Sequence, residues 1–279
     1  MKRETFEQEY SELGFSNKFM FGRIMRDADR AKPFLEEILG IKIHHIEYVD
    51  REKDMDVNPD SHGIRMDLYV DDGKTIYNCE MQSRNDGNLR KRSRYYQGII
   101  DAYNLESGDD YDNLKKTFII FICTFDLFGE DRYIYKFESR CEDNPELKLN
   151  DGAVKVFINT KGSIGNVSDS FRELMHFIDT SDIKEYKSDL VNNLKDALVD
   201  ARKRKDWRDS YMTMKEYFRQ VQRETREETQ EEDLYKYISR MKKLGVEEGN
   251  IIEAIMEDFE YSREKAEESV HKLLLQPQQ

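Results

Sequence analysis

Two acidic residues, Asp67 and Glu80, stand in the middle of segments that otherwise have the pattern of β-strands. Apolar and polar residues alternate through residues 64–70 and again through 75–82, and a period of two is typical of a strand. The residues at 71–74, Asp-Asp-Gly-Lys, favour a tight turn. We therefore expect an antiparallel hairpin that brings the carboxylate of Asp67 close to that of Glu80.

Two neighbouring carboxylates repel each other unless a cation lies between them. Ligation by oxygen atoms alone suits Mg²⁺ or Mn²⁺, so the pattern favours a divalent-metal site at Asp67 and Glu80. Gln82 lies two residues beyond Glu80 and should share its strand face, which adds an amide to the same site. The plainer alternative is that both acids are exposed on the solvated face of a hairpin. The residue pattern alone leaves both interpretations open.

The segment that follows this candidate site is rich in positive charge. Residues 84–105 contain five basic residues against two acidic ones, and most of the basic ones fall on a predicted helix over 88–106. Cations beside a metal site suit a phosphate backbone, so we expect Arg94 and Tyr95 to face nucleic acid. The alternative is a surface helix whose aromatic rings pack in the core, and for Tyr96 that alternative is the stronger one. The basic residues of this helix are Arg90, Lys91, Arg92 and Arg94.

The overall charge does not favour wholesale binding of nucleic acid, because the net charge is −13 and the isoelectric point is near 5.1. Much of the negative charge lies after residue 223, where 15 acidic residues stand against 8 basic ones. A local basic groove therefore remains compatible with the composition. A second basic run fits a DNA contact and a solvated helix equally well, and its members are Arg202, Lys203, Arg204, Lys205 and Arg208.

The elements around these residues indicate an α/β protein. Helices are predicted over 16–40, with Ser16 as the N-cap, and a first strand over 41–49. The further predicted strands are 117–124, 132–137 and 154–158. Beyond residue 160 the pattern is helical, with helices at 171–178, 186–201 and 211–232 and three short helical patterns over 234–275. We expect a core over 1–160, a helical extension over 161–232 and a small acidic helical tail over 233–279.

The composition also excludes several classes of protein. No apolar run approaches the roughly 18 residues of a membrane helix, and the N-terminal residues lack the apolar region of a secretory signal. The three cysteines form no C-x-x-C pair, and so sparse a set favours reduced thiols. We therefore expect a cytoplasmic protein without a membrane partner.

The two acids, the helix before them and the basic helix after them resemble the signature of the PD-(D/E)XK nuclease superfamily. Gln82 stands where that superfamily usually has lysine. This substitution is typical of one branch, the PD-(D/E)XK family transposases and recombination-promoting nucleases (Rpn). The resemblance extends over about residues 15–232, and its blocks are NKFMFGRIMRD, GIRMDLYVDD, YNCEMQSR, RSRYYQGIIDAYNLESGDDY and RKDWRDSYMT.

The resemblance implies a restriction-endonuclease-like core, with a mixed central sheet flanked by helices, that hydrolyses phosphodiester bonds with a divalent cation. Asp67 and Glu80 would be the catalytic acids and metal ligands, with the backbone carbonyl of Met81 as a third ligand. Gln82, at the catalytic lysine position, can position a water molecule by hydrogen bonds but cannot carry a positive charge. The residues of the basic helix assigned to DNA are Arg90, Arg92, Arg94 and Tyr95.

Lys18 is a departure from the pattern of the family. Relatives often have an acid next to the asparagine of the first helix, and this chain has Lys18 there. The lysine would weaken the site if that acid assists metal binding. Alternatively, Lys18 would take the place of the missing motif lysine.

The sequence thus predicts a DNA endonuclease that depends on Mg²⁺ or Mn²⁺ and is linked to recombination or mobile elements. DNA is the expected partner, and a homodimer is left open as an assembly. The alternative is a nuclease-fold protein with weak or no catalysis that binds DNA or another protein. The acidic tail from about Leu234 onward is expected to be dispensable for cleavage.

Overall fold

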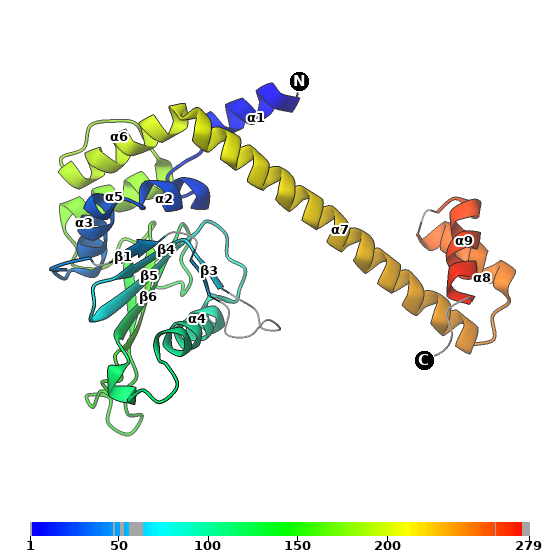
Figure 1. Cartoon of the computed structure of the whole chain (residues 1–279), viewed down its shortest axis with the longest axis horizontal. Coiled ribbons are helices and arrows are strands. Elements are labelled where there is room, and N and C mark those ends of the chain that lie inside the picture. Colours follow the sequence, from blue (N-terminus) through cyan, green and yellow to red (C-terminus); the bar gives the residue numbers. More distant parts are fainter. Residues whose placement is uncertain (1, 47, 51–52, 56–63, 260, 275–279) are drawn as a thin grey trace. The chain divides into compact units, whose positions relative to one another are not determined.

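The computed structural model describes residues 2–46, 48–50, 53–55, 64–259 and 261–274 (Figure 1). Contacts divide the chain into two compact units, Met1–Asp209 and Ser210–Gln279. The first unit contains the sheet and the helices that hold the candidate site. The second unit is helical, and the boundary between the units falls within helix α7 (Lys205–Lys243).

The first unit is built on a six-stranded mixed sheet with the strand order β1-β4-β5-β6-β8-β7. Strands β5, β6 and β8 are parallel, whereas β1 pairs with β4, β4 with β5, and β7 with β8 in antiparallel fashion. Every residue of β6 after the first is buried, as expected for a central parallel strand with a continuous apolar run. The bounds are β1 (Tyr48–Asp50), β4 (Leu68–Asp71), β5 (Thr75–Gln82), β6 (Lys116–Cys123), β7 (Ile134–Phe137) and β8 (Ala153–Asn159). A separate antiparallel pair joins β2 (Lys53–Met55) to β3 (Ile64–Met66).

Helices cover the sheet of the first unit. Helix α4 packs its buried residues onto one face, where Tyr96 and Ile100 join a core cluster with Ile119, Phe121 and Phe157 of the strands. Helix α2 contacts β5, and α2, α3 and α5 all pack against α6. The bounds are α1 (Lys2–Ser11), α2 (Lys18–Ile24), α3 (Ala28–Leu39), α4 (Leu89–Asn104), α5 (Asp169–Thr180) and α6 (Asp189–Lys203). The predicted α/β core, with a mixed sheet flanked by helices, is confirmed.

The start of the chain differs from the prediction in two details. The N-cap of α2 is Asn17, whose side chain accepts hydrogen bonds from the backbone N–H groups of Phe19 and Met20, so the prediction of Ser16 was wrong. The strand predicted over 41–49 is confirmed only at its end, where Tyr48 and Val49 belong to β1, and residues 41–46 form no strand. The Ile43 backbone N–H donates to the Glu36 carboxylate at 2.8 Å, so a helix side chain satisfies a backbone group that a strand would have paired.

The second unit contains most of α7 together with α8 (Glu248–Asp258) and α9 (Arg263–Leu274). The helix predicted over 211–232 is one part of the longer α7. Gly245, at φ +76°, follows the end of α7 in a left-handed conformation that glycine adopts without strain. The small core of this unit consists of Leu234, Ile238, Ile251, Ile255, Ala266 and Val270. None of the helices in the described ranges combines the length and apolarity needed to cross a bilayer.

Candidate active site

The predicted hairpin brings Asp67 and Glu80 together. Strands β4 and β5 pair with Leu68 opposite Cys79, and Asp67 occupies the single residue between β3 and β4, level with Glu80. The backbone N–H of Asp67 donates to Glu80 Oε1 at 3.0 Å. In return, Asp67 Oδ2 accepts a hydrogen bond from the backbone N–H of Met81 at 2.9 Å. Each carboxylate is thus oriented by the backbone of the opposite strand segment.

Both acids are removed from solvent. Asp67 is 8% exposed and Glu80 is 0% exposed, so they are not the solvated surface acids of the plainer interpretation. Burial raises the pKa of Glu80 well above its ordinary value, and the negative charge of Asp67 raises it further. The positive charge of Lys18 opposes this increase. The pair therefore favours any cation that can lie against it.

Two basic side chains lie against these acids. Lys18 Nζ is 3.7 Å from Asp67 Oδ2 and 3.9 Å from Glu80 Oε2. Arg92 Nη2 is 3.5 Å from Glu80 Oε2. The guanidinium group of Arg92 also lies 5.3 Å from the ring centre of Phe121, which is the neighbour of Glu80 in β6. Arg92 therefore belongs to the acid pair more directly than to an exposed binding surface.

Gln82 ends β5 on the same side of the strand as Glu80 and is 4% exposed. Its Nε2 atom is buried and has no hydrogen-bond partner among the residues that the structure describes. A buried amide nitrogen without a partner is costly, and in a native site it is normally satisfied by water or by a ligand. Met81, which stands between Glu80 and Gln82 in the chain, is buried. Its backbone N–H already donates to Asp67.

These residues fit a divalent cation as a set of oxygen ligands. No group of three or more His, Cys, Asp or Glu side chains is gathered for metal binding within the described ranges, so the side chains contribute two carboxylates. The remaining ligands would have to be backbone or amide oxygens, water or a phosphate. Such a set suits Mg²⁺ or Mn²⁺ better than zinc, which prefers nitrogen and sulfur.

The other residues assigned to DNA lie on the first turns of α4. Arg90 donates from Nη2 to the Leu127 carbonyl at 3.3 Å, and its guanidinium group lies 5.0 Å from the ring centre of Phe128. Arg94 is exposed, and Tyr95 is 41% exposed. Tyr96 is buried at 7% exposure, which confirms the core position expected for it.

The arginines of the second basic run form hydrogen bonds and ion pairs with nearby residues of the first unit. Arg202 Nε donates to the Leu13 carbonyl at 2.9 Å. Arg204 makes two hydrogen bonds to Asp206, at 3.1 and 2.7 Å. The side chain of Arg208 pairs with Glu7 at 3.5 Å. These contacts join α6 and the start of α7 to the N-terminal residues.

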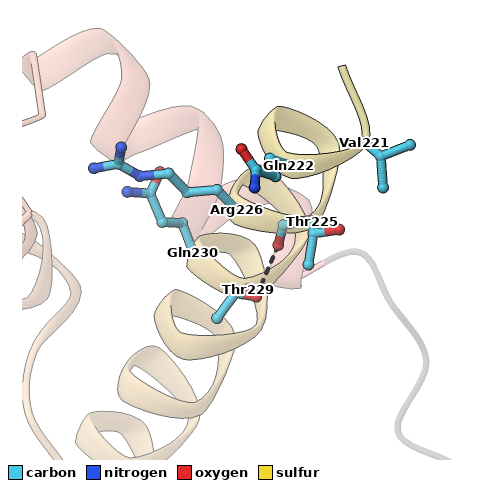
Figure 2. Close-up of a pocket in the computed structure, with 6 residues that line it drawn as sticks. All are labelled: Val221, Gln222, Thr225, Arg226, Thr229 and Gln230. Carbon is cyan, nitrogen blue, oxygen red and sulfur yellow. Dashed lines mark hydrogen bonds between the residues drawn. The ribbon is translucent and has the colours of Figure 1, made fainter. Parts of the chain in front are cut away.

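A hollow of about 350 Å³ opens next to the start of α2 and the end of β5. Asn17 and Ser83, the direct chain neighbours of Lys18 and Gln82, line it together with Glu9 and Glu12 of the N-terminal region. A second hollow, of about 430 Å³, lies along one helix, and all of its lining residues belong to α7 (Figure 2). Figure 2 shows Thr229 bonded to the Thr225 carbonyl there, and no acid or histidine is among the described residues that line this hollow.

Sequence reasoning missed the contact between Arg92 and Glu80. The signal was the position of Arg92 in the first turn of a helix that begins seven residues after Gln82. Because the connection between β5 and α4 is short, the first turn of the helix must lie close to the end of the strand. Of the two arginines in that first turn, Arg92 is the one with Tyr96 one turn later, on the buried side of the helix, and it was therefore the one to examine.

A buried pair of acids on a hairpin of a mixed, helix-flanked sheet is consistent with an α/β core of the nuclease type. A family model for the PD-(D/E)XK nuclease family transposases matches residues 13–255, and the chain belongs to this family. The matched segment includes all the residues predicted for the site. Searches of curated proteins and of solved structures gave no match. Nucleases of the PD-(D/E)XK type generally use divalent metal ions, which agrees with the oxygen ligands present here.

Proposed function

We propose that this protein is a Mg²⁺- or Mn²⁺-dependent DNA endonuclease of the recombination-promoting branch of its family, acting in recombination or on mobile elements. The supporting observation is the Asp67–Glu80 pair, whose carboxylates are buried side by side and each held by a backbone N–H. Burying two like charges destabilises a fold. A site that binds a divalent cation provides a reason for this arrangement.

Asp67 and Glu80 would hold the cation, with the Met81 carbonyl as a further ligand. When bound, the cation would neutralise the acid pair and stabilise the negative charge that builds on the phosphate. Gln82 would orient a water molecule through its amide, since its Nε2 is unsatisfied and its position on β5 is next but one to Glu80. The amide cannot accept the proton of that water as a lysine amine could.

The charges around the site suggest the side from which DNA approaches. Arg90, Arg94 and Tyr95 lie on α4, whereas Glu9 and Glu12 line the hollow next to Asn17 and Ser83. Phosphate groups are attracted to the arginines of α4 and repelled by Glu9 and Glu12. In this proposal the DNA backbone follows the first turns of α4, and Arg92 remains with Glu80.

A plasmid-nicking assay tests this function. The wild-type protein should convert supercoiled DNA to nicked DNA with Mg²⁺ or Mn²⁺ and not with EDTA. Asp67→Asn, purified in the same way, is the control for a contaminating nuclease. Cleavage that persists in EDTA or in Asp67→Asn would contradict the proposal.

The second candidate function is a nuclease fold that binds DNA or a partner without cleaving. It is favoured by Gln82 at the lysine position and by the cations of Lys18 and Arg92, which already lie against the acids. Calorimetric titration with Mn²⁺ distinguishes the two functions. The nuclease should bind the ion through Asp67 and Glu80, and the binding module should not.

A further inference from the structure

Lys18 is placed against both carboxylates at once. Its Nζ atom is within 4 Å of Asp67 Oδ2 and of Glu80 Oε2, and its side chain is 50% exposed. Both distances exceed the length of a direct hydrogen bond, so the ammonium group acts as a shared counter-ion. The Asn17 cap fixes the start of α2 and therefore the backbone position from which Lys18 reaches the acids.

We propose that Lys18 is an internal counter-ion that stabilises the acid pair when no metal is bound and competes with the divalent cation for it. This inference rests on the metal site of the proposed function. Lys18 thereby sets the concentration of divalent cation that the protein requires. Lys18 acts through the two acids, whose negative charge it balances, and takes no direct part in cleavage.

The surroundings of the two cations explain why Lys18 is the one that gives way. Arg92 is held by two aromatic rings: its guanidinium group lies 5.3 Å from the ring centres of both Tyr96 and Phe121, and its side chain is only 22% exposed. Lys18 has a flexible stem, it contacts no aromatic ring among the described residues, and half of its side chain already faces solvent. Its ammonium group can move into water with little loss of other contacts.

A divalent cation would repel the ammonium group strongly. Mg²⁺ lies about 2.0–2.1 Å from its oxygen ligands and carries twice the charge of a lysine. A lysine that remained within 4 Å of the same oxygens would be close to the ion, so binding requires the ammonium group to leave. The free energy of the lost ion contacts is then subtracted from the affinity for the metal.

Lys18→Met tests this inference, because methionine keeps an unbranched stem and removes the charge. Mn²⁺ affinity, measured by calorimetry on the EDTA-treated and dialysed protein, should rise about tenfold, within the usual range for two coupled binding events. The midpoint of thermal unfolding should fall without metal and should equal or exceed that of the wild type at saturating Mn²⁺. A lysine with a purely structural role would lower both midpoints alike.

Lys74→Met is the matched control, since Lys74 is an exposed lysine in the β4–β5 turn, at the far end of the same hairpin. It should leave the affinity for Mn²⁺ unchanged. Lys18→Gln should behave as Lys18→Met and serves if the methionine variant does not fold, and Lys18→Arg should bind Mn²⁺ no more tightly than the wild type. If the folded neutral variants bind Mn²⁺ as the wild type does, or more weakly, this inference is wrong and the metal site stands. If the wild type itself binds no Mn²⁺, the proposed function fails and the inference fails with it.

Discussion

The basic run on α4 and the basic run at the junction of α6 and α7 are similarly dense in charge, but their surroundings differ. On α4, Arg92 lies against a buried acid of the site, while Arg94 projects from the first turns of the helix as an exposed residue. At the junction, Arg202, Arg204 and Arg208 each bond to a carbonyl or a carboxylate of the same unit. The second run therefore has a structural role in addition to any role in binding.

This difference shows what the density of charge in a sequence leaves open. Both runs fitted DNA contact and a solvated helix. The distinguishing feature is the placement of acids: Asp206 and Glu7 neutralise the junction, whereas on α4 the ion pair of Arg92 is with Glu80, a buried acid of the site. Variants of the acid pair and of the two basic runs test this distinction.

Asp67→Asn and Glu80→Gln should each abolish cleavage, with a loss of at least about 10³-fold, because each removes a ligand charge. The fold should be kept, since the amide oxygen of Asn or Gln can still accept the backbone N–H. Plasmid nicking in Mg²⁺ measures the loss, and circular dichroism checks the fold. If either variant cuts at the wild-type rate, Asp67 and Glu80 do not form the metal site.

Arg94→Gln should weaken binding to duplex DNA by about tenfold at low salt and reduce the slope of log K against log salt by about 1. Arg204→Gln is the paired variant. It should leave DNA binding unchanged and lower the midpoint of thermal unfolding by at most about 3 °C, because it removes one exposed ion pair with Asp206. Fluorescence anisotropy at several salt concentrations compares the two. Equal losses of DNA affinity would remove the distinction between the runs.

Gln82→Lys would add a further cation on the face of β5 that carries Glu80, so that the positive charge around the acid pair increases while the α6–α7 junction is unchanged. An amine can accept the proton of the attacking water and stabilise charge on the phosphate, so cleavage should be about tenfold faster at saturating Mg²⁺. The same charge repels the metal, so half-maximal cleavage should require more Mg²⁺. Rates measured over a Mg²⁺ series test both effects. Normal metal binding without faster cleavage would mean that Gln82 is not at the lysine position.

Glu80 should make the stability of the metal-free protein depend on pH. Burial, with the charge of Asp67, raises the pKa of Glu80 above its ordinary value of 4.5. At a pH between the ordinary pKa, which applies to the unfolded chain, and the raised pKa of the native protein, Glu80 holds a proton in the native protein that it has lost in the unfolded chain. The free energy of unfolding therefore falls as the pH rises through this range. Urea unfolding in EDTA, at pH steps upward from 4.5, should show this fall in the wild type and a flatter profile in Glu80→Gln. Identical profiles would mean that Glu80 titrates normally.

Removal of the chain from Leu234 onward should have the smallest effect on chemistry. The cut removes every member of the small core of the second unit and leaves the first unit intact. It also removes negative charge overall, so cleavage should be unchanged or slightly faster at low salt. A folded, soluble truncation that is inactive would contradict this expectation.

The sequence was sufficient for the parts of the molecule that local pattern determines. The alternation in 64–82 predicted the hairpin, and the continuous apolar run predicted the central strand β6. Residues 41–46 misled because their β-branched composition resembles a strand, whereas Glu36 binds the backbone there. The approach of Lys18 to Glu80 depends on how α2 packs against β5, and such packing has no local pattern. The division at residues 160 and 232 stays a prediction, which limited proteolysis would test.

The reciprocal backbone bonds between Asp67 and the β5 segment bear on the entropy of binding. Both carboxylates are already fixed by N–H groups of the main chain, so a ligand meets side chains that have few rotamers left to lose. Such pre-organisation moves the cost of ordering the site from the binding step to the folding step. The residual adjustment on binding is then concentrated in one flexible lysine and the displaced water, while the two acids act as a rigid receptor.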